Sequence, residues 1–129
     1  MTDEQVAEAI DRLRSIMDEL PETSEGVTHG AITFHVRERR VLAALVDQRG
    51  SGDGLSLLAP APPGVQEDVV ASEPARFFRP ADRGEEGWIG LRIDLAPNWR
   101  EITEVIHDAY RLVAPRALVR QLDAELTTS

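Results

Sequence analysis

The chain has 129 residues, 42% of them hydrophobic, and its formal net charge is −9. This length suits one domain over residues 1–129, with enough apolar side chains for a core that needs no metal or disulfide. The absence of cysteine excludes disulfides and thiol chemistry. The acidic balance, concentrated at a net −6 in residues 1–35, disfavours strong non-specific binding to nucleic acid.

The sequence shows no targeting or membrane segment. Residues 2–11 are acidic and polar and lack the apolar stretch of a signal peptide. The longest apolar run, residues 41–46, is far too short to span a bilayer. Because a cysteine-free chain also suits a reducing compartment, we expect a cytoplasmic protein without membrane contacts. The sequence leaves the oligomeric state open, with a slight preference for a monomer.

An amphipathic helix is predicted over residues 3–20. Its apolar residues recur at spacings of three and four, namely Val6, Ile10, Leu13, Met17 and Leu20. Thr2 or Asp3 can cap its start, where acidic side chains also complement the helix dipole. Pro21 ends the helix because proline cannot continue the hydrogen-bond ladder.

Three strands are predicted next. Residues 32–37 alternate, with Ile32, Phe34 and Val36 on one face, and Glu38 and Arg39 form a hairpin tip. The apolar residues 41–46 suit a central strand. Residues 50–54 suit a flexible loop, and residues 55–59 a third strand. Together these segments predict an antiparallel three-stranded meander.

The second half of the chain adds one strand and three helices. Residues 60–64 break the sheet, residues 65–72 suit a short helix with Val65 and Val69 inward, and residues 73–86 are irregular. Residues 88–95 predict a strand with Ile89, Leu91, Ile93 and Leu95 on one face, and Trp88, Gly90, Arg92 and Asp94 on the other. Asn98 caps a helix that Pro115 interrupts, and residues 116–126 form the last helix.

This order of elements predicts an α+β fold. Helices at both ends of a run of strands indicate one antiparallel sheet covered on one face by the N- and C-terminal helices. Such a sheet leaves its other face in water, which accounts for the alternation of apolar and polar residues.

We find no catalytic motif. The three histidines, His29, His35 and His107, lack partners at metal-site spacing. Ser56 has no flanking glycine pair, and residues 50–54 lack the lysine of a phosphate-binding loop. We therefore expect a non-enzymatic protein without a cofactor.

Two surface groups remain as candidates. Glu4, Glu8 and Asp11 lie on one stripe of the first helix, where their oxygens could bind a hard cation or simply form a solvated face. The second group projects from the water side of the sheet and its hairpin tip, and it comprises His35, Arg37, Arg39, Arg40, Trp88 and Arg92. An aromatic ring among guanidinium groups can stack a base while they hold phosphates. The alternative is that Trp88 packs beneath residues 73–86 and the arginines pair with acids.

Several short motifs resemble, in order and spacing, those of the MmcQ/YjbR family. They are Leu20-Pro21, His29-Gly30, Phe34, Arg39-Arg40, residues 74–80, residues 87–94, Trp99 and residues 108–115. The resemblance covers nearly the whole chain.

The resemblance implies a frataxin-like (CyaY-like) α+β sandwich and brings no catalytic residues with it. It also implies DNA binding through hairpins, although the charge of −9 and Asp82, at a position often aromatic in the family, depart from that expectation. The frataxin-like fold further suggests iron binding through Glu4, Glu8 and Asp11. Two functional hypotheses follow: a module that binds DNA or a partner protein, or a metal-handling protein.

Overall fold

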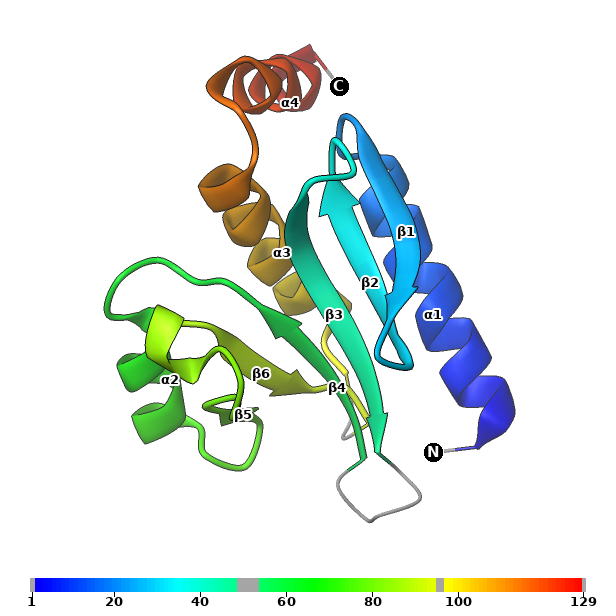
Figure 1. The fold of residues 1–129 in the computed structure, drawn as a ribbon, viewed down its shortest axis with the longest axis vertical. Coiled ribbons are helices and arrows are strands. Elements are labelled where there is room, and N and C mark those ends of the chain that lie inside the picture. Colours follow the sequence, from blue (N-terminus) through cyan, green and yellow to red (C-terminus); the bar gives the residue numbers. More distant parts are fainter. Residues whose placement is uncertain (1, 49–53, 95–96, 129) are drawn as a thin grey trace.

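The computed structural model describes residues 2–48, 54–94 and 97–128, and it shows a six-stranded antiparallel sheet with α-helices packed against it (Figure 1). The sheet order is β1-β2-β3-β4-β6-β5. The strands are β1 (Thr23–Thr28), β2 (Ala31–Val36), β3 (Arg40–Gln48), β4 (Gly54–Ala59), β5 (Phe77–Phe78) and β6 (Ile89–Arg92). The helices are α1 (Asp3–Asp18), α2 (Val65–Ser72), α3 (Trp99–Val113) and α4 (Arg116–Thr128), with a 3-10 turn, η2 (Gly84–Glu86). The predicted α+β fold class is confirmed.

The helix boundaries follow the capping residues seen in the sequence. Thr2 caps α1 in a reciprocal arrangement with Gln5, and the Asn98 side chain accepts a hydrogen bond from the backbone of Glu101. Residues 65–72 form α2 as predicted. Residues 50–53 of the predicted loop, and Leu95 of the predicted strand, lie outside the described residues.

The prediction misses β1 and β5. β1 has the polar sequence Thr-Ser-Glu-Gly-Val-Thr, with one large apolar side chain, and it is a strand because all six of its residues pair in register with β2. β5 has two residues and exists only beside β6. Tertiary pairing, and not local propensity, therefore defines both edges of the sheet.

One in-register row of apolar side chains crosses all six described strands. It runs through Val27, Ile32, Leu45, Leu57, Leu91 and Phe77. The α1 and α3 helices cover this face of the sheet (Figure 1), where the core also contains Leu13, Met17, Ile102 and Ile106. The row therefore determines which face of the sheet is buried under helices.

The neighbouring row faces the other way and is made mostly of small residues. It runs through Gly26, Thr33, Ala44, Leu58, Gly90 and Phe78. Because side chains alternate along a strand, placing the apolar row under the helices places this row on the open face. The expectation that this whole face meets water is wrong, since Thr33 and Ser56 are buried there and residues 80–88 cover part of it.

A buried tyrosine joins the last third of the chain to the start of the sheet. Tyr110 of α3 is fully buried, and its hydroxyl donates a 2.7 Å hydrogen bond to the carbonyl of Pro21. Burial raises the pKa of Tyr110 to about 12. The phenol therefore stays protonated and fixes the link between α1 and β1.

Replacing Tyr110 with phenylalanine should lower the free energy of unfolding by about 1–2 kcal/mol, because the buried carbonyl of Pro21 loses its donor. Urea unfolding monitored by circular dichroism measures this change. As an independent check, absorbance of this single tyrosine should titrate near pH 12 in the native protein and near pH 10 after unfolding. A native titration near pH 10 would contradict the buried hydrogen bond.

Candidate functional site

The open face of the sheet carries a cavity of about 730 Å³. Its floor is formed by Ala31, Thr33, Val41, Ala44, Val46 and Leu58, and its wall by Pro80, Asp82, Arg83, Glu85, Glu86 and Trp88. Thr28 and His29, at the turn from β1 to β2, complete the lining. We call this cavity the sheet-face hollow.

The hollow exists because the sheet has small side chains on one half of its open face and large ones on the other. Thr33 and Ala44 are cross-strand neighbours whose small side chains leave the floor low, and Gly26, which pairs with Thr33 at its border, has no side chain. On the far side, Phe78 packs so closely over Gly90 that a Cβ atom there would lie 2.3 Å from the ring. The floor is thus mainly apolar, and it is bordered by aromatic rings.

A buried glutamine fixes the wall of the hollow. Gln66 of α2 is only 5% exposed, and its Nε2 atom donates to the carbonyls of Gly84, at 2.8 Å, and Trp88, at 2.6 Å. Val69 packs partly against the core as predicted, but the most buried residue of α2 is this polar one. Gln66 therefore connects α2 to both ends of residues 84–88, which carry two of the wall's carboxylates, Glu85 and Glu86.

Trp88 lies on the predicted face but is not available to a ligand as an exposed ring. The residue is 6% exposed, and the Arg83 guanidinium lies 4.7 Å from its ring centroid. The idea of Trp88 as an open stacking platform is therefore wrong, and the alternative, in which it packs beneath the preceding segment, is the observed arrangement.

The predicted arginines do not form one surface. Arg37 adopts a positive φ of 53° in the β2–β3 turn and pairs with Glu22 at 3.2 Å, so it leaves the strand alternation. Arg92 lies 4.9 Å from the ring centroid of Phe78 and reaches towards the backbone carbonyls before β5. Both side chains are occupied by neighbours within the chain.

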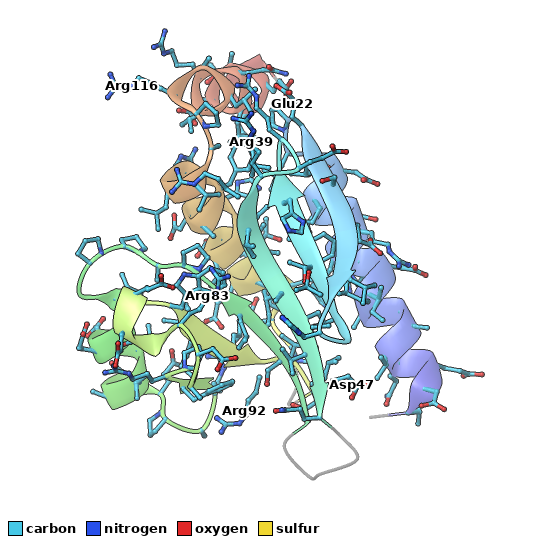
Figure 2. The ribbon with its side chains drawn as sticks, in the orientation of Figure 1. Glu22, Arg39, Asp47, Arg83, Arg92 and Arg116 are labelled. Carbon is cyan, nitrogen blue, oxygen red and sulfur yellow. The ribbon has the colours of Figure 1, made fainter. Side chains whose placement is uncertain are left out.

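Arg39 and Arg40 are exposed at the hairpin tip, and within the described chain neither makes an ion pair. Arg92 is in register with Ser56, and Ser56 with Val46, which is six residues along β3 from Arg40. That separation is roughly 20 Å along the strand. Figure 2 shows Arg39 and Arg92 at opposite ends of the sheet.

His35 is half-buried near the hairpin end and is outside the hollow lining.

The acidic residues of α1 do not converge on a metal site. Glu4, Glu8 and Asp11 are exposed, and the described residues contain no group of three or more histidine or acidic side chains that could hold a metal ion. Metal binding by this helix stays a prediction of the sequence.

His107 is half-buried on α3, and burial lowers its pKa, which favours the neutral imidazole.

The charge around the hollow is acidic. Asp82, Glu85 and Glu86 are exposed on its wall, and Arg83 is the one cationic side chain among the described lining residues. That cation stacks on Trp88. The wall could not be predicted because residues 73–86 show no periodicity. Gln66 escapes prediction for another reason, since a polar residue in a short helix is expected to face water. The small residues Gly26, Thr33 and Ala44 are the sequence feature behind the hollow, but only the register of β1, β2 and β3 brings them together.

No helix in the described ranges combines the length and apolar character needed to cross a membrane. The YjbR family model matches residues 18–112. The chain is also similar in structure to Deinococcus radiodurans protein DR2400, whose domain is described as DUF419, with 22% sequence identity and a TM-score of 0.70. The match covers 88% of this chain and 87% of that one, and it supports the fold. No curated protein gives a significant match.

Replacing Gln66 with leucine should lower the free energy of unfolding by about 2–4 kcal/mol, because two buried carbonyls lose their donor. In a Trp99→Phe background, Trp88 should report the loosened wall by a red-shifted emission. Gln121→Leu, at an exposed position of α4, is the matched control and should change stability by less than about 0.5 kcal/mol. Equal effects of the two substitutions would mean that Gln66 does not hold the wall.

Proposed function

This chain belongs to the YjbR family, and we propose that it is a non-enzymatic binding protein whose recognition site is the sheet-face hollow. Its volume, about 730 Å³, is in the range of pockets that enclose a small ligand or a few side chains. The hydroxyl of Thr33 donates to the carbonyl of Ala31, at 3.2 Å, and is therefore engaged within its own strand. Among the described lining residues, no hydroxyl is hydrogen-bonded to a histidine or a carboxylate, which supports a role in binding.

The ligand that best fits the hollow is an apolar group that carries a positive charge, presented by a partner protein. One observation carries this choice: an apolar floor, with Ala44, Val46 and Leu58, lies beside a wall with three exposed carboxylates. An apolar side chain gains by burial on the floor. A cation gains from the carboxylates, and the net charge of −9 attracts a basic partner at longer range.

Filling the hollow should weaken this binding. A capped leucine–arginine–leucine tripeptide is the probe, and it is too short to pair as a strand. Ala44→Phe places a ring on the floor and should weaken its affinity by at least about tenfold in an NMR titration. Glu85→Gln with Glu86→Gln should weaken it about threefold to tenfold at low salt, and less at high salt.

Two controls accompany these variants. Ala117→Phe adds the same ring at an exposed position of α4, and Glu67→Gln with Asp68→Asn removes the same charge from α2. Both should bind like the unaltered chain. If a leucine–glutamate–leucine tripeptide binds as well as the arginine probe, the acidic wall is not a determinant and the proposed ligand class fails.

Duplex DNA is a second candidate ligand, and the observation that favours it is local. Arg39 and Arg40 are exposed at the tip of a tight turn, where Arg37 and Glu38 both adopt left-handed backbone angles. A protruding hairpin with two free guanidinium groups can contact adjacent phosphates. The surrounding acidity limits such binding to low salt.

If DNA binds, Arg39→Ala with Arg40→Ala should reduce the slope of log affinity against log salt concentration by about 1.8, because two phosphate contacts are lost. Fluorescence anisotropy with a labelled duplex measures this slope. Arg116→Ala with Arg120→Ala, on exposed positions of α4, is the control for net charge. No binding of the unaltered chain at low salt rules out the DNA candidate.

A further inference from the structure

One long edge of the sheet has no further strand paired with it among the described residues. β1 is at one end of the strand order and has six residues, whereas β5 at the other end has two. Edge strands expose backbone donors and acceptors, and proteins usually protect them with lysine, proline, a bulge or a covering segment. β1 contains neither lysine nor proline, and its register with β2 is unbroken over all six pairs.

The pairing of β1 with β2 determines which backbone groups point outward. The amide of Arg37 donates to the carbonyl of Glu22, which marks residues 22 and 37 as a hydrogen-bonded pair. Hydrogen-bonded pairs alternate along an antiparallel ladder, so Ser24, Gly26 and Thr28 face β2. The N–H and C=O groups of Thr23, Glu25 and Val27 therefore point away from β2, towards the open edge.

The charge on this edge is already neutralised. Glu25 accepts two hydrogen bonds from Arg14 of α1, at 2.8 Å each, and the bond from Arg14 lowers the pKa of that carboxyl. A charged edge residue normally discourages pairing with another strand. Here the charge is paired on the helix side of β1, so it leaves the outward backbone groups accessible.

The β1 edge also carries an exposed apolar side chain that an added strand could pack against. Val27 is 74% exposed and is the outermost member of the apolar row that crosses the sheet. In Figure 1, α1 and β1 run side by side in opposite directions. Moving from the Arg14–Glu25 pair towards the start of α1 therefore brings Ile10 and Ala7 to the level of Val27. A seventh strand would extend the row under the flank of α1.

The helix beside this edge selects the partner's charge. α1 contains five acidic residues and two arginines, and the guanidinium of Arg14 is bound to Glu25 while Arg12 lies over Trp99. Asp11 and Asp18 are exposed on the same side of the helix as Arg14. Side chains that project from an added strand towards α1 thus meet an apolar strip bordered by carboxylates.

We propose that the β1 edge binds an extended, basic segment of a partner polypeptide by strand addition, with apolar and arginine or lysine side chains alternating along it. Backbone hydrogen bonds to Thr23, Glu25 and Val27 supply affinity, and the acidic flank of α1 supplies selectivity. A second copy of this chain fits less well, because pairing β1 with β1 would bring two acidic α1 helices together. This surface lies at the sheet edge and is distinct from the sheet-face hollow.

The test uses the full chain and a capped octapeptide of alternating valine and arginine. Val27→Pro removes the outward N–H without removing a bond to β2, whereas Val27→Thr keeps both the N–H and the branched side chain. Val27→Pro should weaken affinity by about tenfold or more, and Val27→Thr by no more than about twofold. On binding, the amides of Glu25 and Val27 should exchange with solvent more slowly.

Further variants separate this proposal from the sheet-face hollow. Asp11→Asn with Asp18→Asn should weaken octapeptide binding and reduce its salt dependence, whereas Glu67→Gln with Asp68→Asn should not. Ala44→Phe should leave octapeptide binding unchanged, and Val27→Pro should leave tripeptide binding unchanged. Unaltered exchange at Glu25 and Val27 overturns strand addition. The choice of a basic partner segment is overturned if the chain forms a concentration-dependent dimer that Val27→Pro abolishes. It is also overturned if a valine–glutamate octapeptide binds as tightly as the valine–arginine octapeptide.

Discussion

The structure depends on one apolar row that crosses six strands in register and is buried over the middle of the sheet. From Val27 at one edge to Phe77 at the other, each strand contributes a large apolar side chain to the face beneath α1 and α3. In β2, β3, β4 and β6 a slip of one residue would turn the apolar set to the opposite face, so burial determines the register of these strands. The edge strand β1, whose Val27 is 74% exposed, is held by its backbone pairing with β2. Tyr110 and Arg14 then tie the two covering helices to the first strand and its connection.

The row also determines the character of the other face. Alternation leaves Thr33 and Ala44 there, and these side chains are too small to fill the space beneath residues 80–88. Gln66 donates hydrogen bonds to the carbonyls of Gly84 and Trp88 in that segment. These bonds keep the wall and its carboxylates beside the apolar floor. The hollow is thus a consequence of side-chain size and register together, and neither alone would produce it.

Much of the fold could be predicted from the sequence, but little of the site could. Periodicity and capping residues identify α1 and α3 because those signals are local, as at Thr2 and Asn98. The short helix α2 has no side-chain cap and is indicated by the spacing of Val65 and Val69 alone. β1 escapes notice because its single large apolar residue, Val27, gives no pattern. The burial of Trp88 and the separation of Arg40 from Arg92 depend on how distant strands pair, which alternation along one strand cannot reveal.

Acidic charge is the feature that both proposed surfaces share. The wall of the hollow and the flank of α1 each place carboxylates beside apolar side chains, while Arg37, Arg83 and Arg92 are engaged within the chain. The charge distribution therefore favours a basic polypeptide partner over a nucleic acid. The most direct measurement is a residue-resolved NMR titration with the leucine–arginine–leucine tripeptide. The account predicts shifts concentrated at Thr33, Ala44 and the indole N–H of Trp88; shifts confined to Arg39 and Arg40, or none at all, would contradict it.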